Sequence, residues 1–303
     1  MLAYRKYYED FCTDISKGVI VSEIQKELNR DFSESEKKSF RVSLSSVKNA
    51  LQNVEIPVKA QVGLEMTVPL TSKRIDFIIA GEDNAGNKNV IIVELKQWEK
   101  VKHTEMSDIV LLGPEQRVHP SWQAFSYKTT ITNFNEYVEN NPINVYSCCF
   151  LHDYKKENEN EIKHEIYEEG LEVSPAFISD EWIKFAEFVG NKIKKSSEVN
   201  LLYEISGGRI KPSQFLVDCL SDSLNGNSRI ELIDQQRVAF SNLKNEINKA
   251  LKTNNRKVFL VKGGAGTGKS LIAMHLLGEL HKKGKTAFYV AKSSYIKETY
   301  FKC

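Results

Sequence analysis

The chain has 303 residues, and 42 Lys and Arg against 40 Asp and Glu leave a formal charge of +2. Hydrophobic residues make up 41% and charged residues 27%, which is typical of a globular chain that buries a core. These values exclude a disordered chain, a collagen-like repeat and a disulfide-stapled miniprotein, and the length accommodates about two domains of ~100–200 residues each. The near-zero net charge does not decide for or against nucleic acid, because a neutral protein can carry one basic groove.

The cysteines and the N-terminus indicate a reduced, cytoplasmic protein. The five cysteines are odd in number and scattered without a CxxC pair, so neither a disulfide framework nor a zinc ribbon is predicted. The N-terminal residues alternate charged and aromatic side chains, unlike a signal peptide. The sequence has no apolar run near the ~18 residues of a transmembrane helix, so we expect no membrane partner.

The first half of the sequence predicts one α/β unit. Apolar residues recur at helical spacing over residues 33–51, and Ser33 with Glu36 has the spacing of a capping box. Short β-branched runs then indicate strands, and a Gly- and Asn-rich turn at residues 81–89 separates two of them. The predicted elements are helix 33–51, strands 58–68, 75–80 and 90–93, helix 121–140 and strand 145–151.

The remaining sequence predicts a connecting region followed by a second α/β unit. Residues 155–169 are mostly Lys, Glu and Asn, which is typical of a solvated loop or an exposed helix. Amphipathic helices are expected at 179–189 and 212–224, and the polar run 225–228 is the candidate linker. The second unit is expected to hold helix 235–251, strand 258–261, a Gly-rich loop, helix 270–280 and strand 286–290. We therefore divide the chain into regions 1–152, 153–228 and 229–303.

The most specific motif is GGAGTGKS at residues 263–270, which matches the phosphate-binding pattern GxxxxGK[ST]. Glycines let backbone N–H groups curl around a phosphate, and the N-terminus of the next helix adds partial positive charge. Lys269 is expected to reach the β- and γ-phosphates of ATP, and Ser270 to ligate Mg²⁺. The candidate nucleotide-binding residues are Gly263, Gly264, Ala265, Gly266, Thr267, Gly268, Lys269 and Ser270.

A second motif lies upstream, where residues 232–239 read LIDQQRVA. This run resembles the Q-motif LxxxQxxA of superfamily 1 helicases, in which the glutamine amide reads the adenine edge. Gln236 stands at the matching position, and the alternative is a surface glutamine on a helix. The stretch from residue 231 to about residue 300 resembles the opening of Schlafen-group-like bacterial DNA/RNA helicases of superfamily 1, which implies an ATP-binding, RecA-like fold.

The motor is expected to be incomplete. A RecA-like motor needs a Walker B acid and an arginine from a second lobe, and no strand ending in an acidic pair follows Lys269 in the sequence. We expect this chain alone to bind nucleotide poorly and to hydrolyse it hardly at all. We interpret it as a fragment of a longer nuclease-helicase.

Two strand-like segments of the first unit carry acids. Asp76 lies in the run RIDFII, and Glu94 and Lys96 end the next buried strand as ELK. Alternation along a strand puts Glu94 and Lys96 on one face and Leu95 on the other. If the strands pair across the turn at 81–89, Asp76 comes alongside them. Two converging carboxylates can hold Mg²⁺ or Mn²⁺, and a lysine beside them can orient the attacking water or help to deprotonate it, which is the equipment for hydrolysing a phosphodiester.

This strand–turn–strand setting resembles the PD-(D/E)xK nuclease superfamily, whose core has the same α-β-β-β-α-β order. Ile75 replaces the proline that precedes the first acid in the family pattern. Gln123 and Tyr127 match the QxxxY motif of RecB-type members and lie at i and i+4, on one face of a helix. The resemblance covers residues 33–151 and implies a restriction-endonuclease-like fold.

The resemblance also implies roles for individual residues. Asp76, Glu94 and the carbonyl of Leu95 would hold Mg²⁺ or Mn²⁺. Lys96 would position the water and stabilise the charge that develops on the phosphorus centre. Gln123 and Tyr127 would orient the metal site and contact the DNA backbone.

Several neighbouring residues have two interpretations. His119 could join the site, or it could cap a helix or face solvent. Glu36 or Glu23 could supply the further helical acid found in some of these nucleases, or could lie on a solvated helix face. We expect a core role, in preference to base stacking, for Trp122, Phe125 and Phe134.

We therefore predict metal-dependent hydrolysis of nucleic acid, with DNA favoured over RNA, coupled to an ATP-dependent helicase or translocase motor. The resemblance places such proteins in bacterial DNA processing or phage defence. Two alternatives stay open: a nucleic-acid-binding module in which the nuclease fold is inactive and only positions a motor, and a nucleotide-sensing signalling ATPase. The expected cofactors are Mg²⁺ or Mn²⁺ and ATP, and a homo-oligomer is left open.

Overall fold

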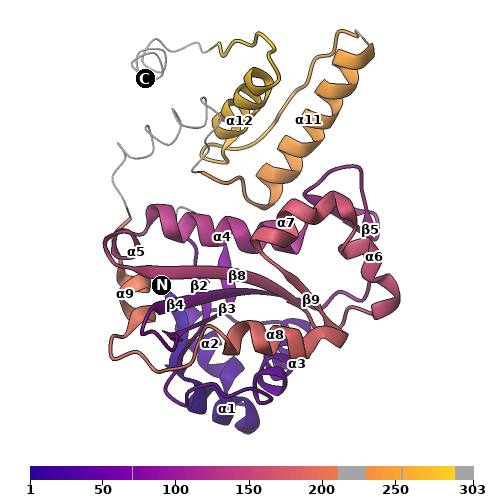
Figure 1. The fold of residues 1–303 in the computed structure, drawn as a ribbon. Helices are drawn as coiled ribbons and strands as arrows, with labels where there is room; N and C mark the ends of the chain where they lie inside the picture. The colour runs from indigo at the N-terminus through magenta and orange to yellow at the C-terminus, as the bar shows by residue number, and fades with distance from the viewer. Residues whose placement is uncertain (70, 211–229, 254, 291–303) are drawn as a thin grey trace.

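The computed structural model describes residues 1–69, 71–210, 230–253 and 255–290. Its centre is a six-stranded sheet in the spatial order β1-β2-β3-β4-β8-β9, with helices on both faces (Figure 1). The strands are β1 Leu2–Tyr7, β2 Gln61–Thr67, β3 Arg74–Glu82, β4 Lys88–Lys96, β8 Ile143–Leu151 and β9 Ala176–Ile178. The first four strands pair antiparallel, whereas β8 pairs parallel with both β4 and β9. The predicted mixed α/β class is confirmed.

The parallel pairing of β8 with β4 requires a long crossover between them. The crossover carries a small antiparallel sheet of β5 Lys102–His103, β6 Ile109–Leu112 and β7 Glu115–Val118. It continues through α4 Pro120–Phe134 and α5 Glu136–Asn140. Figure 1 shows α4 lying across one face of the main sheet. The crossover thereby brings the start of α4 over the end of β4.

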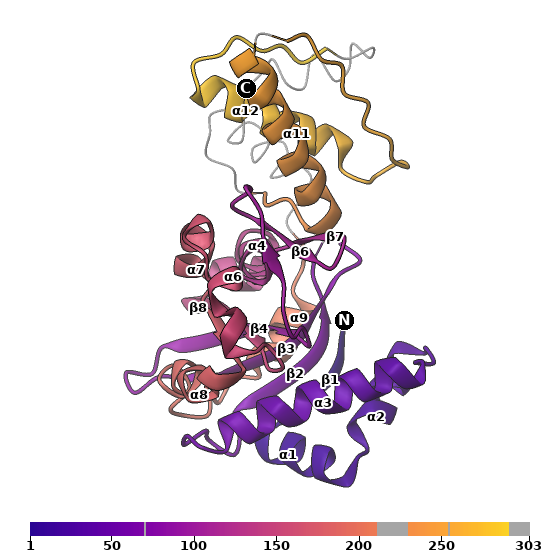
Figure 2. The same ribbon diagram turned by 90° about the vertical axis from the view of Figure 1, so that its right-hand side faces the viewer.

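The opposite face of the sheet is covered by α1 Tyr8–Lys17, α2 Ile20–Leu28, α3 Glu34–Leu51 and α8 Trp182–Gly190 (Figures 1 and 2). Helix α3 begins with the predicted capping box: the N–H of Glu36 donates to Ser33 Oγ at 3.2 Å, and the N–H of Ser33 donates to Glu36 Oε2 at 2.8 Å. Each bond satisfies a backbone donor that the helix itself leaves free.

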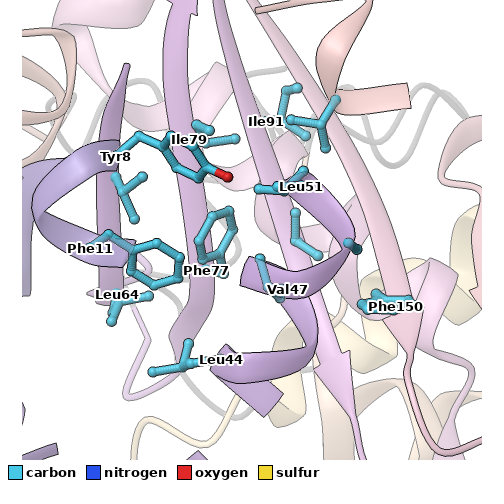
Figure 3. Packing of buried hydrophobic residues seen from close by; sticks show 14 of the residues in the cluster. Tyr8, Phe11, Leu44, Val47, Leu51, Leu64, Phe77, Ile79, Ile91 and Phe150 are labelled. Atoms are coloured by element: carbon cyan, nitrogen blue, oxygen red, sulfur yellow. The ribbon is translucent and has the colours of Figure 1, made fainter. Parts of the chain in front are cut away.

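The core between these helices and the sheet is built from aromatic and branched side chains (Figure 3). Phe11 of α1 meets Phe77 of β3 edge-to-face at 5.5 Å between ring centroids, and both rings are fully buried. Val47 and Leu51 of α3 are fully buried beside them. This packing fixes α3 against the strands that carry the candidate site.

The connecting region matches its prediction in one helix, since the helix expected at 179–189 is present as α8, and differs from it elsewhere. Between residues 153 and 210, β9 joins the main sheet, while α8 and α9 Leu201–Gly207 pack on it. The charged run 155–169 forms short helical turns whose Tyr167 is fully buried. The sequence pattern does not predict β9, because a strand of three residues is too short to show an alternation of apolar and polar residues. The predicted helix 212–224 and linker 225–228 lie outside the described residues.

The predicted helix 121–140 is interrupted at Asn135. This residue has an extended backbone, and its side chain accepts from the N–H of Val138 at 3.2 Å while donating to the carbonyl of Ile205 at 2.7 Å. Local side-chain bonding of this kind competes with helical hydrogen bonds. The segment therefore divides into α4 and α5.

Two strand predictions in the second unit are wrong. Of the described residues 255–290, only α12 Lys269–Lys282 forms a regular element, and it follows α11 Asp234–Thr253. Segments 258–261 and 286–290 pair with no strand, and Val258 is 97% and Phe288 84% exposed. A strand is stabilised by its neighbours, so the apolar pattern alone does not form one here. No helix in the described part of the chain is long and apolar enough to cross a membrane.

The contact of α8 with the sheet yields a stability prediction. Phe185 of α8 is fully buried and stacks on Phe150 of β8, with 4.5 Å between ring centroids. We expect Phe185→Ala to lower the free energy of unfolding by about 3–5 kcal/mol in a urea titration. Ile183→Ala is the control on the same helix, because Ile183 is 50% exposed, and its effect should stay within about 0.5 kcal/mol. Equal effects of the two substitutions would show that α8 does not belong to the cooperative core.

Candidate functional site

The candidate site lies where β3 and β4 diverge. The register of the two strands ends at the pair Phe77 and Val93, whereas Glu94, Leu95 and Lys96 stay paired with β8. Asp76 Oδ2 accepts the N–H of Leu95 at 2.8 Å, so a side chain replaces a ladder bond at this point. The structure thereby brings Asp76 to the end of β4.

Glu94 and Lys96 form the second part of the site. Lys96 Nζ donates to Glu94 Oε1 at 2.6 Å, and Glu94 is only 3% exposed. Among the described residues, nothing donates to the buried Glu94 Oε2. The carboxyl of Asp76 lies near enough for its charge to act on Glu94. A buried carboxylate oxygen without a donor is costly unless a proton or a cation meets it.

Burial changes the protonation of this cluster. Removal from water raises the pKa of Asp76 to about 6, and the same effect together with the charge of Asp76 raises the pKa of Glu94 to about 8. Burial alone would lower the pKa of Lys96, but the charges of Glu94 and Asp76 outweigh it and raise that pKa. Lys96 is therefore a charged donor, suited to holding an anion or a water rather than to removing a proton.

Helix α4 places the predicted QxxxY pair over this cluster. Gln123 Nε2 donates to the Tyr127 hydroxyl at 2.9 Å, and Tyr127 is 1% exposed. Burial raises the pKa of Tyr127, and the nearby charge of Glu94 adds to the effect. Gln123 and Lys96 line one cavity of about 370 Å³, which we call the lysine cavity. Tyr127 thus belongs to the packed support of the site, while Gln123 reaches its open side.

A second cavity, of about 170 Å³, lies against α3, and we call it the acid cavity. Its lining includes Glu36, Glu65, Asp76 and Leu95. Leu95 and Lys96 are consecutive residues of a strand, so their side chains point to opposite faces. The acid cavity and the lysine cavity therefore flank the end of β4.

Glu65 is a site residue that the sequence analysis missed. It lies between Leu64 and Met66, whose strand partners Phe77 and Ile75 flank Asp76. Its backbone φ is 54°, which is rare for a residue with a side chain. Burial raises the pKa of its carboxyl to about 7, although Arg74 lies 3.8 Å away. The signal that could have identified it is a charged residue within residues 62–66, which are otherwise apolar and buried.

The residues with two interpretations separate in the structure. His119 caps α4, its Nδ1 accepting the N–H of Ser121 at 3.2 Å, and it is fully buried. Glu36 lines the acid cavity, although it also caps α3 and pairs with Arg30. Glu23 pairs with Lys6 and lines neither cavity. The expected core positions are confirmed for Trp122 and Phe134, whereas Phe125 is partly buried.

The donor set fits a hard divalent cation better than a softer metal. No group of three or more His, Cys, Asp or Glu side chains in the described residues is arranged to hold a metal. Asp76 and Glu94 are two carboxylates, and the predicted third ligand is the carbonyl of Leu95. Mg²⁺ is commonly held by one or two carboxylates, with water and substrate oxygens completing its shell. The free oxygen of Glu94 is the observation that favours a cation there.

The Gly-rich loop precedes α12 as predicted. Gly266 and Gly268 have φ values of 72° and 88°, which glycine adopts without strain. Lys269 Nζ donates to the carbonyls of Gly263 and Gly264 at 3.0 and 2.5 Å. The lysine thus folds back over its own loop, and Ser270 follows it in the first turn of the helix.

Gln236 lies against this loop. Its Nε2 donates to the carbonyl of Thr267 at 3.2 Å, and a Cβ at Gly268 would fall 2.5 Å from the same nitrogen. The structure therefore brings the predicted adenine-reading residue and the predicted phosphate loop into contact.

One family model matches the chain, over residues 256–300, and its description is the DNA/RNA helicase domain of Schlafen group 3. The matched segment contains the Gly-rich loop and α12. The helicase-like part of the sequence resemblance is supported by this match. No curated protein and no solved structure matches the chain.

The raised pKa values of the two acids predict how metal binding depends on pH. A carboxyl whose pKa is raised by folding stabilises the fold below its unfolded pKa, and this contribution is lost as the pH rises through about 6 and about 8. Mn²⁺ competes with the same protons, so it should raise the thermal unfolding midpoint more at pH 8 than at pH 6. At one hundred times Kd the stabilisation is about 2.7 kcal/mol.

Glu94→Gln should abolish this metal response in differential scanning fluorimetry. Glu181→Gln is the matched control, because Glu181 is also buried and also pairs with a lysine, Lys163. It should keep the full response. A response that survives in Glu94→Gln would place the metal elsewhere.

The loop geometry predicts a role for Lys269 in nucleotide binding. Replacement by alanine removes the cation expected to meet the phosphates. Lys269→Ala should therefore weaken the binding of a fluorescent ATP analogue by about tenfold or more, measured by titration in the presence of Mg²⁺. Lys257→Ala is the control, because Lys257 lies before the loop and pairs with Glu246. Equal affinities of the two variants would contradict the assignment of the loop.

Proposed function

We propose that this chain is a metal-dependent nuclease joined to a nucleotide-binding segment of helicase type, with DNA favoured over RNA as its substrate. The observation that carries the proposal is the convergence of Asp76, Glu94 and Lys96 at one strand end, with one buried carboxylate oxygen left without a donor. The match of residues 256–300 to a helicase domain supports action on nucleic acid.

In this proposal Asp76, Glu94 and the carbonyl of Leu95 hold Mg²⁺ or Mn²⁺. A metal ion of this kind, when bound, activates water and neutralises charge on a phosphodiester. Asp76 orients the strand end by accepting the N–H of Leu95, which fixes the backbone that carries the other two groups.

Lys96 supplies the fixed positive charge of the reaction. Hydrolysis adds water to the phosphorus atom and breaks one P–O bond, and negative charge grows on the phosphoryl oxygens. An ammonium group already held by Glu94 stabilises that charge without having to reorganise. Gln123 lines the lysine cavity beside Lys96, where its amide can contact the nucleic-acid backbone, and Tyr127 holds Gln123 in place.

The nucleotide-binding segment is the second part of the proposal. ATP is expected to bind between the Gly-rich loop and Gln236, and Ser270 to ligate the Mg²⁺ that accompanies it. In a longer protein, ATP hydrolysis would drive translocation of the strand that the nuclease cuts. The second candidate is a nucleotide-sensing ATPase that uses the first unit only for recruitment. The helicase-domain match supports the nucleotide-binding part of this candidate.

A cleavage assay tests the nuclease. Single- and double-stranded DNA and RNA are incubated with the chain and Mg²⁺ or Mn²⁺, with and without ATP. We expect cutting in which Glu94→Ala and Lys96→Ala each reduce the rate by ~100-fold or more, because the first removes a metal ligand and the second removes the cation that stabilises the developing negative charge.

The matched controls are Glu181→Ala and Lys163→Ala, which break another partly buried Glu–Lys pair, in the region that follows the first unit. These variants should cut at close to the wild-type rate. An intact chain that cuts none of the four substrates with either metal would refute the nuclease and leave the binding-module and sensing alternatives.

A further inference from the structure

The lysine cavity has the lining of a phosphate-binding site. Lys73, Lys96 and Arg117 reach it from three different segments of the first unit, and Gln123 adds an amide. Trp98 also lines it, with Lys96 Nζ 5.4 Å from its ring centroid. Cations and amides contact the sugar-phosphate backbone, and an exposed aromatic ring can stack on a base. The lining suits a nucleic-acid strand.

One acid from the second unit lies in the same cavity. Asp234 begins α11, and its Oδ2 lies 2.5 Å from Lys73 Nζ, with its side chain 18% exposed. Asp234 adopts a φ of 40°, a conformation that residues other than glycine seldom take. A carboxylate here meets Lys73 in the way that a phosphate oxygen would.

The start of α11 is also held on both sides. Arg237 pairs with Asp108 at 3.2 Å and lies 4.5 Å from the ring centroid of Trp122, both in the first unit. Gln236, two residues after Asp234, contacts the Gly-rich loop through Thr267. The first turn of α11 therefore contacts both the lysine cavity and the Gly-rich loop.

We propose that the lysine cavity binds a backbone phosphate of the strand to be cut, that Lys73 is a substrate-binding residue, and that Asp234 closes the cavity by occupying Lys73. The statement that the bound strand is the one to be cut rests on the proposed nuclease function. A shift of the first turn of α11, which Gln236 ties to the nucleotide loop, releases Lys73 and admits the strand. The Asp234–Lys73 pair is an autoinhibitory contact between the two units.

The test measures binding without cleavage. The anisotropy of a fluorescein-labelled single-stranded DNA is titrated with the full chain in EDTA, so the result does not depend on metal or catalysis. Asp234→Asn should bind about three- to tenfold more tightly than wild type, because it frees Lys73 and leaves the side-chain volume unchanged.

Glu231→Gln is the matched control. Glu231 is 18% exposed like Asp234, precedes α11 in the same segment and pairs with a cation, Arg237. Its replacement changes the net charge by the same amount but does not open the lysine cavity, which it does not line. Wild-type affinity is expected. If Glu231→Gln increased the DNA affinity as much as Asp234→Asn does, the increase would be explained by net charge alone, and the proposal would be overturned.

A double-mutant cycle identifies Lys73 as the group released. Lys73→Ala alone should change the affinity little, since Asp234 already occupies Lys73, whereas Lys73→Ala in the Asp234→Asn background should remove the gain. Additive effects of the two substitutions would contradict the proposal. A competition experiment uses the double variant Asp234→Asn, Lys269→Ala, in which the Gly-rich loop lacks its lysine. ATP added at the same phosphate concentration as the DNA should not displace the DNA from this variant. Displacement would assign the cavity to free nucleotides instead.

The binding test and the nuclease test fail separately. If Asp234→Asn does not change DNA binding but metal-dependent cutting is observed, only the proposal that Asp234 closes the lysine cavity is refuted. An intact binding effect without any cutting would leave a gated nucleic-acid-binding site and refute the nuclease.

Discussion

The hydrogen bond from the Leu95 N–H to Asp76 is the interaction on which the candidate site depends. It replaces a ladder bond where β3 leaves β4, and it fixes the end of β4 while that strand continues beside β8. Because the strands diverge, the acid cavity and the lysine cavity open on either side of the same strand end. Because the surroundings remain buried, the pKa of Asp76 is raised to about 6 and that of Glu94 to about 8. Lys96 is then needed as the internal counter-charge.

The two predicted sites are also neighbours in space. In the sequence, the candidate nuclease residues lie before residue 130 and the Gly-rich loop lies after residue 260. The first turn of α11 contacts both, since Asp234 lies in the lysine cavity and Gln236 lies against Thr267. Figures 1 and 2 show α11 and α12 together on the α4 side of the sheet. A change at the nucleotide loop therefore has a short physical route to the strand end that carries Lys96.

Local patterns predicted the parts of the fold that local chemistry determines. Ser33 and Glu36 specified the start of α3, and the β-branched run before Glu94 specified a buried strand, because each signal lies within a few residues. Side-chain alternation placed Glu94 with Lys96, and helical spacing placed Gln123 with Tyr127. The strand end where Asp76 meets them followed from the turn at 81–89.

The remainder depends on contacts between distant residues. Glu65 joins the acid cavity through strand register, and Asn135 interrupts a helix through a bond to Ile205. Strand β9 and the contact of Asp234 with Lys73 likewise join segments far apart in the sequence. The apolar runs near residues 260 and 288 show the reverse error, since a strand pattern does not form a strand where no described neighbour pairs with it.

The central claim is that Asp76 and Glu94 form a metal site independent of the nucleotide loop. A titration of Mn²⁺ followed by electron paramagnetic resonance, without nucleotide, measures this directly. The account predicts bound Mn²⁺ in the wild type and in Ser270→Ala, and its loss in Asp76→Asn. Binding that persists in Asp76→Asn but disappears in Ser270→Ala would contradict it.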